Sequence, residues 1–158
     1  MKKVRNSLFE TNSSSVHTIT IDKRGMEKPS LDIRRRKKDD GTFGKFIIGK
    51  LGTFGKDFRD YKTQDEKLSY LLTICYLTDG HLNLEDMTDS WAFKDLEREI
   101  CEYCKCDGIK IDPKTEGLAY IDHQTMNDYS YMDDFRYSHM DYVDFVFNSY
   151  VSLHTDCD

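Results

Sequence analysis

Residues 63–80 carry the clearest structural signal in the chain, a helix with a defined start and end. Thr63-Gln64-Asp65-Glu66 is a capping box, in which the first hydroxyl and the fourth carboxylate each accept a hydrogen bond from the other's backbone amide. Apolar residues then recur at helical spacing until Asp79-Gly80, where glycine favours a helix end. Such a helix has to bury its apolar side against a second layer, which the rest of the chain must supply.

The same spacing predicts two further helices, over residues 90–104 and residues 140–153. The buried stripe expected for the last helix consists of Met140, Val143, Phe147, Tyr150 and Val151. Strands supply the second layer. Residues 16–21 are β-branched and alternate, which predicts a strand with His17, Ile19 and Ile21 on one face.

Further strands are expected at residues 46–48, 108–112 and 118–121, and residues 23–45 read as an exposed loop or hairpin tip. The pentapeptide Gly-Thr-Phe-Gly-Lys occurs at 41–45 and again at 52–56, which indicates two turns. The sequence has only two prolines and no low-complexity linker, so it gives no sign of a boundary between domains. We therefore expect one compact α+β domain, residues 1–158, with about three helices on one face of a small, mostly antiparallel sheet.

The net charge of −6 is unevenly distributed. Residues 1–63 carry 16 basic and 8 acidic side chains, residues 64–120 carry 6 and 13, and residues 121–158 carry 1 and 8. One part of the chain is thus suited to anions and another to a basic partner. No apolar run approaches the roughly 18 residues of a membrane span and no secretory signal is evident, so we expect a cytoplasmic protein without membrane contact and with cysteines as thiols.

The stretch Phe9–His17 is a candidate binding or catalytic site. Hydroxyls and turn amides at the start of a strand bind oxyanions, and a histidine there acts as acid, base or orienter. The candidate ligand-binding residues are Asn12, Ser13, Ser14 and Ser15, with His17 as the catalytic candidate. The competing interpretation, which the pattern alone favours, is a Ser/Thr turn that satisfies its own backbone.

Residues 120–125 form a second candidate, Tyr-Ile-Asp-His-Gln-Thr at a strand end. Asp122 and His123 are catalytic candidates there, and Gln124 and Thr125 are ligand-binding candidates, because together they supply a base, an acceptor and two donors. The competing interpretation is a polar turn after an apolar strand. If His17 and His123 lie on adjacent strand ends, the two stretches make one pocket.

Three cysteines, Cys101, Cys104 and Cys106, fall within six residues. Zinc is one interpretation, with a fourth ligand from Cys157, His154 or His123. We favour ordinary core cysteines, because Cys101 and Cys104 lie on one turn of a predicted helix and zinc sites usually show two separated ligand pairs. We therefore expect no metal and no cofactor.

Two charged surfaces suggest partners. The basic run at 34–38, with Phe43, Phe46 and Phe54, suits nucleic-acid phosphates and bases, but Asp39, Asp40 and the acidic remainder argue against nucleic acid. The acidic, tyrosine-rich residues 128–144 suit a basic protein partner. Its candidate partner-binding residues are Asp133, Asp134, Tyr137 and Asp141.

The chain resembles a family of small uncharacterised proteins of bacteriophages and Firmicute-type bacteria. The resemblance is carried by Phe9–His17, by Gly52–Gly55 ahead of Lys67–Leu72, and by Tyr120–Thr125. It implies a phage or mobile-element accessory protein in the host bacterial cytoplasm, and it implies that the Ser/His and Asp-His-Gln-Thr stretches belong to one site. Thr125 and Lys56 depart from the serine and the aromatic residue that the resemblance leads us to expect.

Two functions are therefore expected as alternatives. The first is an accessory protein that binds a host or defence component, such as an anti-CRISPR-like inhibitor, through the acidic surface. The second is a small enzyme or ligand-binding protein acting on a phosphate-bearing or nucleotide-like ligand. In the second, the serines hold the anion, a histidine transfers the proton and Asp122 orients a histidine.

Overall fold

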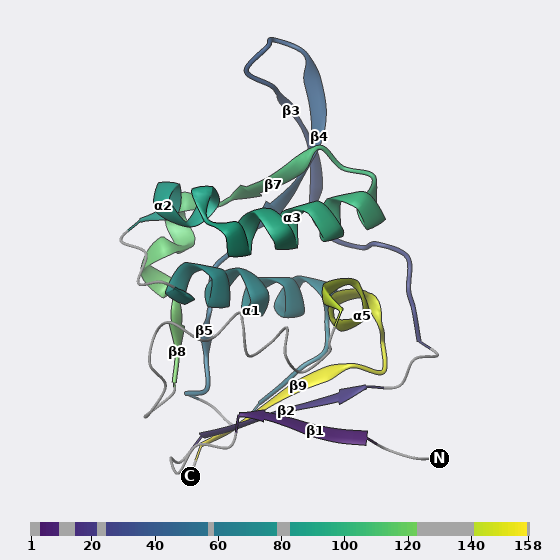
Figure 1. Cartoon of the computed structure of the whole chain (residues 1–158), viewed down its shortest axis with the longest axis vertical. Coiled ribbons are helices and arrows are strands. Elements are labelled where there is room, and N and C mark those ends of the chain that lie inside the picture. The colour runs from purple at the N-terminus through teal and green to yellow at the C-terminus, as the bar shows by residue number, and fades with distance from the viewer. Residues whose placement is uncertain are drawn as a thin grey trace.

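Figure 1 shows a computed structural model of the chain. The structure describes residues 4–9, 15–21, 25–56, 59–78, 83–122 and 141–157, and for residues 4–9, 15–21 and 155–157 it describes the backbone. No helix within these residues is long and apolar enough to cross a membrane.

The largest sheet joins the two ends of the chain. Its order is β1 (Val4–Phe9), β2 (Ser15–Ile21), β9 (Ser152–Cys157) and β6 (Arg59–Tyr61), with every neighbouring pair antiparallel. The strand predicted at residues 16–21 is confirmed as β2. Both chain ends consequently lie on the same side of the molecule, at the bottom of Figure 1.

The other described strands form two smaller sheets. The hairpin of β3 (Ile33–Lys37) and β4 (Phe43–Gly49) is antiparallel, and β7 (Gly108–Ile111) adds to β4 in parallel. The short strands β5 (Thr53–Phe54) and β8 (Tyr120–Ile121) also pair in parallel. The basic run is thus one strand of a hairpin, within the segment expected to be a loop or hairpin tip.

Two of the three predicted helices are confirmed. In α1 (Gln64–Leu77), the Thr63 hydroxyl accepts the Glu66 amide at 3.2 Å and the Glu66 carboxylate accepts the Thr63 amide at 3.1 Å. Ser90 caps α3 (Trp91–Cys104). Two helical elements of the described residues were not predicted: the six-residue helix α2 (Leu84–Asp89) and the 3₁₀ helix η2 (Pro113–Leu118). The strands β1, β6 and β9 were not predicted either.

The last predicted helix, residues 140–153, is wrong in its second half. Helix α5 (Tyr142–Phe147) stops at Asn148, whose backbone is extended, and β9 follows. Residues 152–157 fill the place between β2 and β6, where their backbone groups pair on both sides, and this pairing outweighs the helical period. Tyr150, expected to be buried, is 57% exposed.

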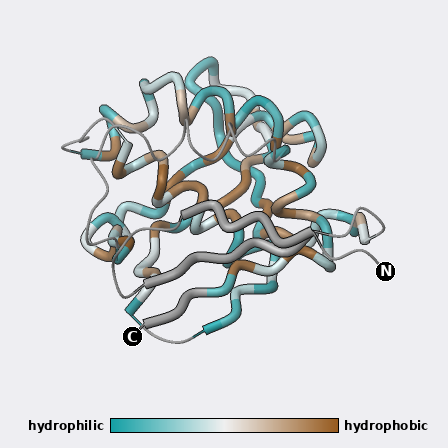
Figure 2. The backbone as a smooth tube through the Cα atoms, turned by 60° about the horizontal axis from the view of Figure 1, so that its bottom comes forward, coloured by the Kyte–Doolittle hydropathy of each residue, from teal (hydrophilic) through white to brown (hydrophobic). Residues whose placement is uncertain are grey.

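The helices pack between sheets. In Figure 1, α1, α3 and α5 lie between the β3–β4–β7 sheet and the β1–β2–β9–β6 sheet, so the helices are covered from two sides rather than one. Figure 2 shows the hydrophobic residues gathered in this interior. The fully buried residues of α1 include Tyr70, Leu71, Leu72 and Ile74. The α+β class is confirmed.

Candidate functional site

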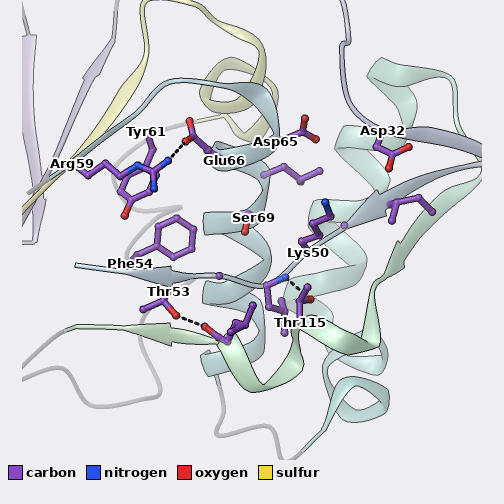
Figure 3. Close-up of a pocket in the computed structure, with 16 residues that line it drawn as sticks. Asp32, Lys50, Thr53, Phe54, Arg59, Tyr61, Asp65, Glu66, Ser69 and Thr115 are labelled. Atoms are coloured by element: carbon purple, nitrogen blue, oxygen red, sulfur yellow. Dashed lines mark hydrogen bonds and ion pairs between the residues drawn. The ribbon is translucent and has the colours of Figure 1, made fainter. Parts of the chain in front are cut away.

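A cavity of about 380 Å³ opens beside the first half of α1 (Figure 3). The β4–β5 connection, β6 and η2 form its other walls. Its lining includes Asp32, Lys50, Leu51, Gly52, Thr53, Phe54, Arg59, Tyr61, Asp65, Glu66, Leu68, Ser69, Thr115 and Leu118. Cavities of roughly 300–1,000 Å³ are typical of small-molecule sites.

The deepest part of the cavity is apolar and aromatic. Leu51, Phe54, Tyr61 and Leu68 are each at most 6% exposed. The ring of Phe54 lies 5.0 Å from that of Tyr61 and 5.2 Å from that of Tyr70, at interplanar angles of 60° and 82°. These tilted and edge-to-face contacts hold the aromatic wall in one arrangement.

The second Gly-Thr-Phe-Gly-Lys repeat builds this wall. A Cβ on Gly52 would lie 2.9 Å from the Phe54 ring and 3.0 Å from the Ser69 hydroxyl oxygen, so only glycine lets the chain pass this close to α1. The Gly52 amide donates to the Thr73 hydroxyl at 2.9 Å. Gly55 has φ +87°, a conformation that favours glycine. The repeat therefore marks the turn expected from the sequence and positions the cavity wall.

Two carboxylates of the cavity are already engaged. The Glu66 carboxylate accepts a hydrogen bond from the Arg59 guanidinium, with 2.7 Å between Oε1 and Nη2. Burial opposes ionisation of Glu66, but hydrogen bonds from Thr63 and Lys62 and the charge of Arg59 outweigh it and lower its pKa. The guanidinium of Arg34 bonds Asp32 at 2.6 Å and lowers the pKa of that carboxyl. Both groups are ionised and neutralised near neutral pH.

Three polar side chains of the cavity are uncommitted. Lys50 and Asp65 form no ion pair with any residue in the described ranges, and the Ser69 hydroxyl makes no hydrogen bond there. Figure 3 shows Lys50, Ser69 and Phe54 around one space. An ammonium, a hydroxyl and an aromatic ring facing one cavity suit a ligand that has both a flat ring and an anionic group.

Asp122 lies beside this cavity without lining it. Its amide donates to the Phe54 carbonyl at 2.9 Å, and its carboxylate accepts the Tyr120 hydroxyl at 3.3 Å. The β5–β8 pairing thus brings residues 52–55 and residues 120–122 side by side. His123, Gln124 and Thr125 lie outside the described residues.

His17 and Ser15 lie on β2. The register places His17 opposite Thr155 of β9, which is opposite the cavity residue Arg59 of β6. The backbones of His17 and Arg59 are therefore two strand spacings apart, about 10 Å. Asn12, Ser13 and Ser14 lie outside the described residues. That His17 and His123 share a pocket stays a prediction.

The predicted partner surface falls mostly outside the described residues, as do Asp133, Asp134 and Tyr137. Asp141 is described, and its carboxylate caps α5 by accepting the amides of Val143 at 2.7 Å and Asp144 at 3.4 Å. A partner role for these residues stays a prediction, and a charge-reversing substitution such as Asp141→Lys also removes a helix cap.

The three clustered cysteines lie in or against the core. Burial raises the pKa values of Cys101 and Cys104 to about 12, so both thiols are protonated near neutral pH. The Cys106 thiol donates to the Cys104 carbonyl at 3.6 Å. Across the described ranges, no three His, Cys, Asp or Glu side chains are grouped to hold a metal ion.

One pair of side chains that are hydrogen-bonded to each other was missed from the sequence. The His154 Nδ1 lies 2.5 Å from the Asp60 carboxylate, and the two residues are 94 positions apart. Hydrogen bonds from His154 and Lys62 lower the pKa of Asp60. His154 was considered only as a zinc ligand. No local sequence signal joins these residues, because only the β6–β9 pairing brings them together.

In the cavity beside α1, side chains from five separate segments converge. Residues 52–55 and 120–122, which belong to two of the stretches singled out in the sequence, meet at its edge through the β5–β8 pairing. Comparisons of the chain with protein-family models, with curated proteins and with solved structures find no match.

Proposed function

We propose that the protein binds a small nucleotide-like ligand in the cavity beside α1. The observation that supports this most is the combination of a buried aromatic wall with an ammonium that has no ion-pair partner among the described residues, facing the same 380 Å³ space. The ring of the ligand packs on Phe54 and Tyr61. Its anionic group reaches Lys50, and Ser69 donates to one of its oxygens.

The charges that line the cavity support an anionic group on the ligand. Glu66 and Asp32 are each paired with an arginine. Lys50 also contributes to the lowered pKa of Asp32, but it forms no ion pair with any residue in the described ranges. Asp65, at the start of α1, is left to accept hydrogen bonds from ring amino groups. A ligand with a base-like ring and a phosphate uses all three uncommitted side chains.

The biological role that we propose follows from the family resemblance: a phage or mobile-element accessory protein that acts by binding a host or defence component. Of the two candidate activities, binding of a small ligand is our first proposal, because the residues that would bind the ligand lie within the described part of the chain. Binding of a protein through the acidic residues 128–144, as in an anti-CRISPR-like inhibitor, is the second candidate, favoured by the tyrosines and carboxylates of that segment.

Calorimetric titration with a small panel tests the proposal. The panel is adenosine and uridine 5′-monophosphates, the two nucleosides, and inorganic phosphate. We expect the monophosphates to bind more tightly than either fragment, because only they reach both the aromatic wall and Lys50. Failure of every member to bind would rule out the nucleotide-like class.

Substitutions locate the binding. Lys50→Gln should weaken monophosphate binding about 10- to 100-fold, the value of one charge-assisted hydrogen bond, and leave nucleoside binding unchanged. Lys28→Gln is the matched control, because Lys28 is exposed, carries the same charge and does not line the cavity. Equal losses in both variants would show that Lys50 has no specific role.

A further inference from the structure

The β3–β4 hairpin, residues 33–49, is a strongly charged arm that the small-ligand cavity does not explain. We call it the basic arm. It projects from the body at the top of Figure 1. All five residues of β3 are exposed, and four of them are cations. Between residues 32 and 50 the chain has seven basic and three acidic side chains, so this part of the surface attracts anions.

The carboxylates on and beside the arm do not cancel its charge. Asp32 bonds Arg34, and Asp107 pairs with Lys38. Asp40 accepts hydrogen bonds inside the hairpin turn, which lowers its pKa. These carboxylates therefore shape the arm and engage two of its cations. Asp40, together with Asp39 and the acidic remainder of the chain, was the sequence-based reason to expect no nucleic acid.

Other cations of the arm are uncommitted. Arg36 and Lys37 form no ion pair or hydrogen bond through their side chains with any residue in the described ranges. Asp39 is exposed in the turn and offsets one charge. The arm therefore keeps a net positive surface after its internal pairs are counted.

One face of the arm has a hollow lined by three cations, two from β3 and one from β7. It measures about 280 Å³, and Arg34, Arg36 and Lys110 line it. Its floor includes Ile48, which lies opposite Lys110 in the β4–β7 register. Asp112 also lines the hollow; its carboxylate accepts a hydrogen bond from the Lys114 amide at 3.0 Å. The hydrogen bond with Asp32 raises the pKa of Arg34, and the negative charge of Asp112 adds to this shift. The three cations outnumber this carboxylate, so the hollow suits a phosphate group bound by Arg36, Lys110 and the Nη1 of Arg34, whose Nε and Nη2 bond Asp32.

Aromatic rings stand beside the cations on both faces. Phe43 is 63% exposed, and the Arg35 guanidinium lies 5.7 Å from its ring centre. On the other face, the Lys110 ammonium lies 4.6 Å from the Phe46 ring centre. Phe46 is half-buried, so Phe43 is the exposed ring of the two. An exposed ring beside cations is the combination that binds single-stranded nucleic acid, in which bases stack on rings and phosphates contact cations.

We propose that the basic arm binds single-stranded nucleic acid, with a backbone phosphate in the Arg34–Arg36–Lys110 hollow and a base on Phe43. An acidic protein segment matches the charge equally well, but single-stranded nucleic acid carries both a phosphate and a ring on every residue of its chain, which suits cations that alternate with an exposed ring. A duplex keeps its bases stacked and offers that ring no partner. This proposal is independent of ligand binding in the cavity beside α1.

Fluorescence anisotropy with a labelled mixed-sequence 20-nucleotide single strand tests it. With three or four phosphate contacts, raising the salt concentration from 50 to 200 mM should weaken binding about 20- to 50-fold. The triple variant Arg34→Gln/Arg36→Gln/Lys110→Gln should lower the slope of log affinity against log salt by about two. Phe43→Ala should weaken binding about 5- to 100-fold without changing that slope.

The control removes the same charge elsewhere. The variant Lys28→Gln/Lys94→Gln/Lys105→Gln changes three exposed lysines outside the arm and should bind within about twofold of the unmodified protein. Equal loss in this control, or no binding of the single strand, would overturn the proposal. So would equal binding of a matched duplex or of a 20-residue polyglutamate peptide. Excess adenosine monophosphate should leave the single strand bound, which separates the arm from the cavity.

Discussion

Lys67 offers a sharp test of the packing around α1, because its ammonium is buried in the core. Its side chain is 1% exposed. The Nζ atom donates to the carbonyls of Asn148 at 2.8 Å and Val151 at 3.3 Å, and so ties α1 to the turn between α5 and β9. Burial lowers the pKa of Lys67 from 10.5 to about 8.

This lowered pKa makes stability depend on pH with a definite sign. Between about pH 8 and 10.5 the unfolded chain binds the Lys67 proton while the folded chain releases it, so the free energy of unfolding rises with pH. The contribution reaches about 1 kcal/mol at pH 9 and approaches about 3 kcal/mol above pH 10.5, at about 1.4 kcal/mol per pKa unit. Below pH 8 it is absent.

Lys67→Met isolates this effect. Methionine keeps most of the length of the side chain but has no titrating group; it leaves both carbonyls without their donor, a cost of about 1–3 kcal/mol each, and it also removes the desolvation cost of the ammonium. The gap, defined as the unfolding free energy of the unmodified protein minus that of the variant, should therefore increase by about 1 kcal/mol from pH 7 to pH 9. Urea unfolding followed by far-UV circular dichroism at pH 7, 8 and 9 measures it.

A control excludes general effects of losing a lysine. Lys28 is exposed, so Lys28→Met should show a stability difference that does not change with pH. If the gap for Lys67→Met stays constant between pH 7 and 9, or narrows, then the ammonium is not desolvated and the packing described around it is wrong.

Three further predictions follow from other parts of the fold. Thr63→Ala removes the capping box and should cost about 0.5–2 kcal/mol of unfolding free energy, measured in urea; no change would mean that the cap is not formed. Gly52→Ala should cost about 1–3 kcal/mol because its Cβ meets Phe54 and Ser69, whereas at Gly117 a Cβ meets nothing within 4 Å and the same substitution should change stability by less than about 0.5 kcal/mol. The thiols of Cys101 and Cys104 should react with a disulfide reagent at pH 8 far more slowly in the folded protein than in urea, because their pKa values are raised to about 12; equal rates would contradict their burial.

Local signals predicted the elements whose ends are fixed by neighbouring residues. The capping box at Thr63 and the Ser90 cap determine where α1 and α3 begin, so these helices were predictable. The segment 152–157 was not, because its alternation of buried Leu153 with half-buried neighbours becomes favourable only with strands on both sides. Such partners come from distant parts of the chain.

Some of the stretches that form or border the cavity could be singled out from the sequence, but the cavity itself could not be predicted. The Gly-Thr-Phe-Gly-Lys repeat at 52–56 and the Asp122 stretch were noticed, and the structure sets them side by side. Lys50, Arg59 and Ser69 were not singled out, because they come from a connection, a three-residue strand and a helix, and no periodicity links them. The convergence of such residues is a property of the tertiary fold.

The most direct test of the central claim is a two-dimensional ¹H–¹⁵N NMR titration with adenosine 5′-monophosphate, which locates the ligand instead of only detecting it. The proposal predicts that the largest shifts fall on the amides of residues 50–54 and of Ser69, and that Lys50→Gln reduces them at equal ligand concentration. Shifts confined to the basic arm, or no shifts at millimolar ligand, would contradict a nucleotide-like ligand in the cavity beside α1.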